Sequence, residues 1–483
     1  MKILCNVICL CTLLPFALPH TASGDDVWGS FRNGGTGVVA DVDLPVNWTP
    51  ESIAWRSVLP GYGQSSPVIW KGTIYVTSSS GPWQQQCLVS ALRLEDGQLL
   101  WTREFASSGK LENYFRNSRG GPTSCVDERG IYSFFGTGDV LAIDHDGLIQ
   151  WSLSLTDRFG EIVNERGAAS SLAQDDSHVY IVIDHHGPSY ILSINKSDGS
   201  IAWKTERGTR VPSWSSPIFA SIHGEPRLLI SSSDSFDVYD PSDGRQVLQI
   251  PGLQGNHIPS ATVKQNRVYV GSSMLIHQST DEDAVARSNC CIEFVSGSEG
   301  QTDGQLKYEV LWEGDRVSSH YSTPLAIDKY VYYVNKVGVL YCVDSLTGKQ
   351  YFAKRIGNPC WASPLGVTHA SGKSHVYLPL LNGTVIVLET DDSYQEIGRN
   401  RVWAADEHQE MAELAAAMRK ANQVPADQAK PKEGPERILG GLSEKQLHQM
   451  FEYGDPTIYG IAAVDGHLVV RTGMVLYCIK LER

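Results

Sequence analysis

The sequence predicts an all-β fold, an eight-bladed β-propeller of four-stranded antiparallel blades. The first observation is a repeat, in which an alternating apolar strand leads into an Asp-Gly or Thr-Gly turn and a strand ending on a large apolar residue, as at Asp96-Gly97 and Trp101. It recurs at intervals of roughly 40–50 residues, which is typical of propeller blades. The second observation is that seven complete repeats lie between Ser65 and Trp403. The third is an eighth repeat divided between the two ends of the chain.

The divided repeat predicts how the ring closes. Residues 460–479 contain three strand-like segments without a fourth, whereas residues 53–59 resemble the final strand of a repeat. We expect this N-terminal strand to complete the C-terminal blade, because closure removes the two free edges of a linear array. Residues 53–483 are therefore predicted to form the propeller, with residues 25–52 as an N-terminal extension.

Each repeat is expected to open at a Ser/Thr-rich step and to close on the bulky residue. Glycine suits the turn before the closing strand because it adopts positive φ at low cost. The openings contain Ser66-Pro67, Thr123-Ser124, Ser171-Leu172, Ser216-Pro217, Ser260-Ala261, Thr323-Pro324 and Ser363-Pro364. The closing residues are Trp55, Trp101, Trp151, Trp203, Leu248, Trp312, Phe352 and Trp403. We expect the closing residues to dock on the neighbouring blade as core, not to serve as ligand platforms.

Two segments interrupt the repeats. Residues 404–454 are predicted to be a helical insertion between blades seven and eight, in which Met411, Leu414 and Met418 share one face. That face is expected to pack on the propeller itself, with packing on a partner as the alternative. The segment from Gln278 to Thr302 is predicted to be a polar loop inside the fifth repeat.

Residues 1–24 have the pattern of a cleavable signal peptide. Lys2 precedes a short apolar run, and Ala22 and Gly24 are the small residues expected before a cleavage site. The mature chain is therefore expected in the periplasm or outside the cell. Its net charge of −14 comes without any lysine or arginine run, so a nucleic-acid partner is not expected. No other apolar stretch is long enough to span a membrane, and we expect a monomer.

Several motifs resemble a known repeat family. Ala91, Gly97 and Trp101 are spaced as in the docking motif of the pyrroloquinoline-quinone (PQQ)-like propeller repeat, and Asp344 with Thr347-Gly348 resembles its turn. The resemblance covers nearly all of the mature chain. It implies the eight-bladed fold that quinoprotein alcohol dehydrogenases share with BamB, the outer-membrane assembly lipoprotein.

Motifs near the two ends of the chain make this resemblance more specific. Trp28, Phe31 and Arg32 near the start, and Arg471-Thr472 near the end, are similar to exported BamB-like proteins of the planctomycete type. That family is described mostly by its fold, so the resemblance implies no specific activity. The helical insertion departs from the family pattern.

The resemblance to quinoproteins also implies what a catalytic site would need. Such enzymes have a vicinal cysteine pair, an aspartate base, and Asn/Glu ligands for calcium beside the PQQ cofactor. This chain offers Cys290-Cys291, either as a vicinal disulfide or as two adjacent cysteines by chance, and no match for the other groups. Neither the His185-His186 pair nor the acidic run Asp281 to Asp283 is expected to bind metal, since both fit solvated loops better. We therefore expect no cofactor, with PQQ and calcium as the alternative.

A more promising group of candidate ligand-binding residues surrounds one end of the predicted channel. Residues just ahead of each inner strand should converge on the propeller axis, and several of them are aromatic or cationic. The candidates are Gln64, Arg119, Arg166, Trp214, His257, His320, Tyr321 and Trp361. Aromatic and cationic groups together suit stacking on a planar or sugar-like ligand. The alternative is simple packing that fills the propeller centre.

These observations favour an exported, non-enzymatic scaffold that binds another protein of the cell envelope, since the fold by itself names no reaction. Two alternatives remain open. One is a divergent PQQ-dependent oxidoreductase, and the other is a protein that binds a glycan or small ligand at the axial mouth.

Overall fold

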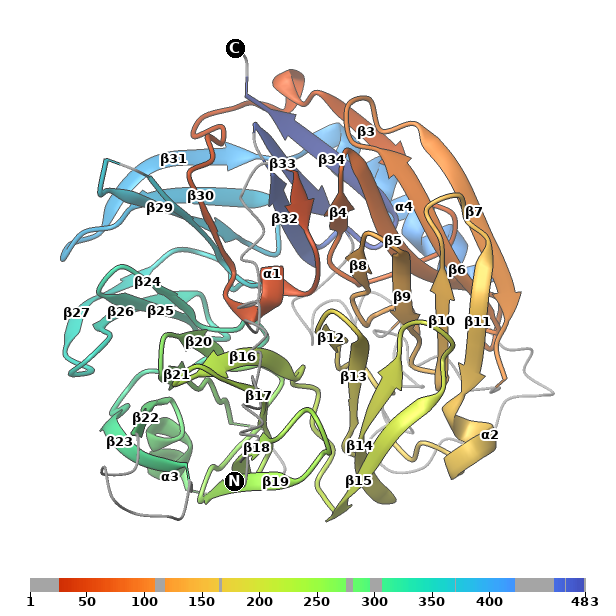
Figure 1. The fold of residues 1–483 in the computed structure, drawn as a ribbon. Coiled ribbons are helices and arrows are strands. Elements are labelled where there is room, and N and C mark those ends of the chain that lie inside the picture. Colours follow the sequence, from red (N-terminus) through yellow and green to blue (C-terminus); the bar gives the residue numbers. More distant parts are fainter. Residues whose placement is uncertain are drawn as a thin grey trace, which may run out of the picture.

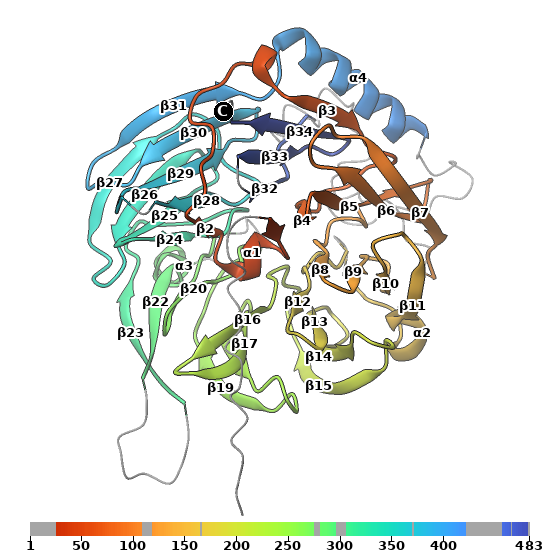
Figure 2. The same cartoon turned by 45° about the horizontal axis from the view of Figure 1, so that its top comes forward.

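The computed structural model describes residues 26–108, 118–164, 167–274, 281–295, 306–369, 371–421, 456–464 and 466–481. They form eight sheets arranged in a ring, which confirms the predicted eight-bladed β-propeller (Figures 1 and 2). Every blade has four antiparallel strands, numbered outward from the axis, and two blades carry a fifth strand at their inner edge. The predicted signal peptide lies outside the described residues.

The strands follow the repeats of the sequence. Blade 1 contains β4 (Val68–Trp70), β5 (Thr73–Ser80), β6 (Gln86–Arg93) and β7 (Leu99–Ala106), and blade 2 contains β8 (Cys125–Asp127), β9 (Gly130–Phe134), β10 (Asp139–Ile143) and β11 (Ile149–Ser154). Blade 3 contains β12 (Ala173–Gln174), β13 (His178–Ile183), β14 (Pro188–Asn195) and β15 (Ile201–Thr209), and blade 4 contains β16 (Ile218–Ile222), β17 (Glu225–Ser231), β18 (Ser235–Tyr239) and β19 (Gln246–Pro251). The short helix α2 (Leu155–Phe159) follows blade 2.

The second half of the ring repeats this order. Blade 5 contains β20 (Thr262–Lys264), β21 (Arg267–Tyr269), β22 (Cys290–Val295) and β23 (Lys307–Glu313), and blade 6 contains β24 (Leu325–Ile327), β25 (Tyr330–Val334), β26 (Val339–Asp344) and β27 (Gln350–Arg355). Blade 7 contains β28 (Leu365–Thr368), β29 (Ser374–Pro379), β30 (Thr384–Glu389) and β31 (Gln395–Arg401). Blade 8 contains β32 (Gly460–Val464), β33 (His467–Arg471), β34 (Val475–Lys480) and, as its outer strand, β3 (Trp55–Val58).

Ring closure takes place as predicted. Strand β3 pairs antiparallel with β34, and Trp55 lies opposite Cys478. Arg471 ties this blade to blade 1, because its buried guanidinium donates hydrogen bonds to the carbonyls of Ser65 (3.0 Å) and Thr77 (2.5 Å). Such bonds satisfy backbone groups that would otherwise be buried without partners.

The closing tryptophans lie against the next blade around the ring. In five of them the indole Nε1 donates to a carbonyl in the turn of that blade: Trp55 to Leu94, Trp101 to His145, Trp151 to Lys196, Trp203 to Pro241 and Trp312 to Ser345, at 2.8–3.1 Å. The glycine of the turn leaves room for the ring. At Gly199, for example, an added Cβ would lie 2.6 Å from the Trp151 indole. Trp403 and Phe352 contact the next blade through ring packing, against Tyr477 (ring centroids 5.9 Å apart) and Tyr394 (6.0 Å) respectively.

A chain of backbone-to-hydroxyl bonds joins the inner ends of the blades. In each step the amide of one repeat-opening residue donates to the hydroxyl of the next, at 2.8–3.1 Å. We call the seven residues the hydroxyl ring: Ser66, Thr123, Ser171, Ser216, Ser260, Thr323 and Ser363. The equivalent position of blade 8 is Gly460, where an added Cβ would lie 2.5 Å from Cα of Ser66. The Ser/Thr openings of the sequence are thus inter-blade connectors.

The segment between residues 26 and 40 lies inside the channel, an arrangement the sequence interpretation did not foresee. Strand β1 (Val27–Trp28) pairs with β4, helix α1 (Arg32–Gly35) forms the turn, and β2 (Val38–Ala40) runs parallel to β28 (Figure 2). The Arg32 guanidinium is fully buried and donates to Gly35 O (2.6 Å), Pro324 O (2.9 Å) and Thr262 Oγ1 (2.9 Å). We call residues 26–40 the channel segment. The 3₁₀ helix η1 (Pro50–Ser52) then leads into β3.

The helical insertion is confirmed for its first part. Helix α4 (Ala405–Ala421) lies beside β3 and β34 at the outer side of the ring (Figure 2). Met411 is buried in the core, Met418 packs against that core, and Glu407 pairs with Arg56 at 2.5 Å. The second predicted helix lies outside the described residues. Within the part of the chain that the structure describes, every helix is too short or too polar to cross a lipid bilayer.

The fifth repeat differs from the sequence interpretation, which placed a polar loop between Gln278 and Thr302. Helix α3 (Glu282–Arg287) begins there, with Asp281 as its N-cap accepting from the Ala284 amide (2.9 Å). Strand β22 follows directly, because the run Cys290–Val295 is mostly apolar and pairs with β21 and β23. The polar residues around this run concealed a strand in the sequence.

Candidate functional site

The two faces of the ring differ in the chain segments they carry. Inner strands begin at one face, which we call the mouth face, and the Asp-Gly turns lie at the other. The channel segment pairs with the inner strands and enters beside Lys71, whose amide donates to Asp26 O (3.0 Å) at the turn face. The predicted mouth residues precede the inner strands, so they lie at the opposite end of the axis.

Aromatic rings from four adjacent blades join at the mouth face. Tyr321 and Trp361 are stacked, with ring centroids 4.2 Å apart and planes at 21°. Trp361 meets Tyr459 edge-on at 5.3 Å, and the hydroxyls of Tyr459 and Tyr62 lie 2.8 Å apart. On the other side, the His320 ring lies 4.0 Å from that of Tyr321. These rings are half-buried, so part of each ring remains open to solvent.

The contacts continue from His320 through blades 5 and 4. His320 Nδ1 lies 3.4 Å from the Ser273 hydroxyl, and Ser273 exchanges backbone hydrogen bonds with Asn256 (2.8 and 3.3 Å). The neighbouring carbonyl of His257 accepts from the Trp214 amide at 3.3 Å. These contacts place His320, His257 and Trp214 along one arc of the mouth face.

The remaining contacts close the circle. The Trp214 indole donates to Gly167 O (3.0 Å), and the Arg119 guanidinium packs directly against Gly167. Gln64 Oε1 accepts from the Ser118 amide next to Arg119 (2.9 Å), and the Ser118 hydroxyl donates to Tyr62 O (2.7 Å). We call this circle of contacts the mouth belt. It contains every described mouth candidate, while Arg166 lies outside the described residues.

Burial makes the belt largely uncharged. It lowers the pKa of His257 to about 4, and together with the charge of Lys336 it lowers the pKa of His320 to about 4. Both imidazoles are therefore neutral at neutral pH, and each is held through Nδ1 by a serine hydroxyl, Ser231 for His257. Burial also lowers the pKa of Arg119 to about 10, which leaves it protonated. Arg119 is the one cation among the described mouth candidates.

Sequence reasoning missed Tyr62 and Tyr459, which complete the belt. Tyr62 stands two residues before the candidate Gln64, so the same counting from the repeat opening could have found it. Tyr459 stands directly before β32, in the repeat whose opening lacks the Ser/Thr signal because Gly460 replaces it. Tyr62 is therefore within reach of counting along the repeat, whereas Tyr459 has no marker in the sequence.

The described residues do not fit a PQQ site with calcium. Cys290 and Cys291 lie in β22, the third strand from the axis, and point into two different hydrophobic clusters. Both are free thiols, so the vicinal disulfide is not formed in this structure, and burial raises the pKa of each. Across the described ranges no three His, Cys, Asp or Glu side chains gather as a metal site would require.

His185 has a structural role. Its Nδ1 accepts from the Val163 amide at 3.0 Å, and its Nε2 lies 3.1 Å from Pro188 O. The adjacent His186 is exposed. The two histidines lie in the turn between β13 and β14, not on a strand as the alternation argument assumed, with His185 buried and His186 exposed.

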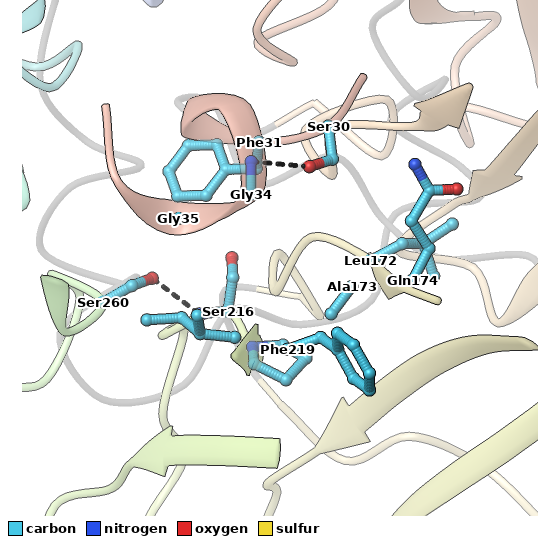
Figure 3. A pocket seen from close by; sticks show the side chains of 12 residues that line it. Ser30, Phe31, Gly34, Gly35, Leu172, Ala173, Gln174, Ser216, Phe219 and Ser260 are labelled. Atoms are coloured by element: carbon cyan, nitrogen blue, oxygen red, sulfur yellow. Dashed lines mark hydrogen bonds between the residues drawn. The ribbon is translucent and has the colours of Figure 1, made fainter. Parts of the chain in front are cut away.

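A small pocket, with room for only a few water molecules, lies beside the axis between the channel segment and blades 3 to 5 (Figure 3). Its residues follow the hydroxyl ring along the inner strands, whereas the belt residues precede it. The ring thus separates this axial pocket from the mouth belt. The residues around it are Ser30, Phe31, Gly34, Gly35, Leu172, Ala173, Gln174, Ser216, Pro217, Ile218, Phe219 and Ser260.

Comparisons with solved structures agree with this architecture. BamB from Moraxella catarrhalis aligns with a TM-score of 0.50 and 14% identity over 88% of this chain and 98% of that protein. The computationally designed Ika8 protein aligns with a TM-score of 0.50 and 13% identity over 88% of this chain and 99% of the design. At these identities the likeness shows the fold alone. A search of curated protein sequences finds no match.

The sequence also matches a family model described as "Outer membrane protein assembly factor BamB". Two overlapping matches cover residues 20–182 and 85–354, which together are more than half of the chain. The ring of eight blades and the PQQ-like repeats are what this family implies. The chain therefore belongs to the BamB-like family of PQQ-like repeat β-propellers.

Proposed function

We propose that this protein is an exported, non-enzymatic scaffold that binds another protein of the cell envelope through its mouth belt. The observation that carries the proposal is the row of half-buried Trp and Tyr rings that four adjacent blades present at the mouth face. Trp, Tyr and Arg are the residues that most often dominate protein–protein binding energy. Across the described residues no three His, Cys, Asp or Glu side chains gather, and the aromatic surface of the belt suits protein binding.

The name of the matched family also supports a protein-binding function. The matched family model carries the name of an outer membrane protein assembly factor, BamB. Assembly implies contact with other envelope proteins, and we extend that kind of contact to this chain. A periplasmic or extracellular location is part of the proposal.

Site-specific photo-crosslinking in the native cells tests the proposal. A photoreactive amino acid placed at Tyr321 or Trp361 should give an adduct with one defined envelope protein. The matched control is Trp70, a half-buried aromatic residue at the turn face. The same adducts from Trp70, or no adduct from either mouth position, would contradict the proposal.

Working without a cofactor is also part of the proposal. Titration of the purified protein with PQQ and calcium should leave the cofactor spectrum unchanged. A saturable spectral shift would favour the quinone-dependent oxidoreductase instead.

A glycan is a second candidate ligand for the same belt. The buried Asn256 side chain and His257 Nε2 have no hydrogen-bond partner among the described residues, and such groups could meet sugar hydroxyls. Binding of the native protein and of the Trp361→Ala variant to a glycan array distinguishes a glycan ligand from a protein partner. Glycan binding that this variant abolishes would favour the second candidate.

A further inference from the structure

Two histidines meet at the turn face of blade 7. His369 directly follows β28, and His375 lies near the start of β29, so the two residues flank the turn that joins these strands. His369 Nε2 lies 3.2 Å from His375 Nδ1, and the ring centroids are 4.6 Å apart with the planes at 67°. Both side chains are half-buried. We call these two residues the histidine pair.

The pairing of β28 with β29 fixes both rings. Val367 lies opposite His375, and His369 stands two residues after Val367, so the alternation of side chains puts both imidazoles on the same side of the sheet. The His369 amide donates to Lys373 O (3.2 Å), and the Gly372 amide donates to His369 O (3.0 Å), which closes the turn between the histidines. Both rings are therefore held by one hydrogen-bonded hairpin, as a preorganised site requires.

The separation of the two nitrogens matches that of two ligands on one ion. A metal–imidazole bond is about 2.0–2.1 Å long, so two nitrogens bound at right or tetrahedral angles to each other lie roughly 2.9–3.4 Å apart. The 3.2 Å between His369 Nε2 and His375 Nδ1 falls within this range. Because the centroids are only 4.6 Å apart, the rings meet at an angle and not end to end, as two ligands of one ion do.

The surroundings favour neutral imidazoles, which are the form that binds a metal ion. Burial, together with the neighbouring His369 ring and the Lys373 charge, lowers the pKa of His375. The one carboxylate that acts on His375 is that of Glu389, which lies opposite it on β30 and accepts a hydrogen bond from Lys373. The two imidazole nitrogens are therefore the ligands that this hairpin offers.

We propose that the histidine pair binds a divalent late transition-metal ion, with copper(II) bound most tightly. Imidazole suits such ions, and copper(II) favours square or tetragonal sets of nitrogen and oxygen ligands, so water completes the set beside two nitrogens. Calcium needs six or more oxygen ligands, and structural zinc needs four protein ligands, which these residues do not supply. The site lies at the opposite face from the mouth belt and does not rest on the proposed function.

Calorimetric titration of the purified protein, without an affinity tag, with copper(II) chloride tests this inference. The native protein should show one saturable site that His369→Ala and His375→Ala each weaken by at least about tenfold, or about 1.4 kcal/mol. The double variant should lose little more than either single variant, because the two nitrogens act as one unit. Electron paramagnetic resonance of the copper-loaded native protein should show two nitrogen ligands.

Blade 3 supplies a matched control. His178 begins β13 at the turn face and is half-buried, with Tyr180 as its ring neighbour and its Nδ1 3.3 Å from the Asp175 carboxylate. His178→Ala should therefore leave the copper affinity unchanged. If His375→Ala fails to fold, His369→Ala and the spectrum of the native protein decide the question. Absence of saturable copper binding, equal effects of His178→Ala and the pair variants, or a spectrum with a single nitrogen ligand would overturn the inference.

Discussion

Buried polar side chains lie at the centre of this propeller, and His257 shows how such burial makes stability depend on pH. Its ring is fully buried against the Ser231 hydroxyl, 2.9 Å from Nδ1, with burial lowering its pKa to about 4. The unfolded chain binds a proton near the ordinary histidine pKa of about 6.5. Between these two values the unfolded state carries more protons than the folded state, so stability falls as the pH falls through this window.

We predict that His257→Gln flattens this pH dependence. From pH 7 to pH 4 the native protein should lose on the order of 3 kcal/mol more unfolding free energy than the variant, because glutamine does not titrate. Urea denaturation at several pH values measures the difference. The control is His186→Gln, an exposed position that should keep the native slope. Equal slopes for His257→Gln and the native protein would show that the buried imidazole does not matter.

The sequence reached some of these residues and not others, for a physical reason. Counting back from each Ser/Thr-Pro step gave Trp214, Tyr321 and Trp361, because equivalent positions of a closed ring converge on its axis. Tyr459 has no such marker, since Gly460 takes the place of the hydroxyl. Contacts such as those of Arg119 with Gly167 depend on the meeting of two blades and leave no local pattern.

Among the secondary-structure elements, α4 is the one whose packing the sequence left open. Its buried side is fixed by Met411, whose sulfur accepts from the Tyr477 hydroxyl at 2.9 Å, while Leu414 is 39% exposed. The helix thus packs on its own propeller, and the amphipathic pattern alone could not tell this from packing on a partner.

We predict unequal effects of shortening the two apolar residues of this helix. Met411→Ala should lower the unfolding free energy by about 2–4 kcal/mol, because it removes buried volume from the core. Leu414→Ala should cost less, about 1 kcal/mol, since the side chain is 39% exposed and loses less buried surface. Chemical denaturation of the full chain measures both. Similar losses at the two positions would mean that α4 is seated differently.

Two elements escaped the sequence interpretation for a common reason. Strand β22 is short and lies among polar residues, and the channel segment pairs with strands far away in the sequence. Neither has a local pattern that separates it from a loop. By contrast, the alternating strands with Asp-Gly turns were recognisable because local periodicity and tertiary burial agree there.

For the whole molecule, the closure between blades 8 and 1 combines a shared hydrophobic core with one buried arginine. Arg471 lies fully buried between them and donates to Ser65 and Thr77, and desolvation lowers its pKa to about 9. The repeat count predicted this closure, because seven complete repeats and one divided repeat make one ring. It did not predict the arginine that joins the two blades.

We predict that Arg471→Ala costs about 3 kcal/mol of unfolding free energy or more, since buried carbonyls lose their donors. Arg355→Ala, at an exposed position on the outer strand of blade 6, is the control and should be near neutral. Guanidinium denaturation compares the two. A loss no larger than that of Arg355→Ala would mean that strand pairing alone closes the ring.

The pairing of Trp55 with Cys478 also constrains when the propeller can fold during synthesis. The Arg471 contact with Ser65 spans 406 residues of sequence, and contacts over such distances form late and slowly. Blade 8 stays incomplete, and blade 1 lacks its neighbour, until the ribosome has delivered nearly the whole chain. A nascent chain of this design cannot complete its ring until its C-terminal strands have been made, so the last step of folding waits for the end of synthesis.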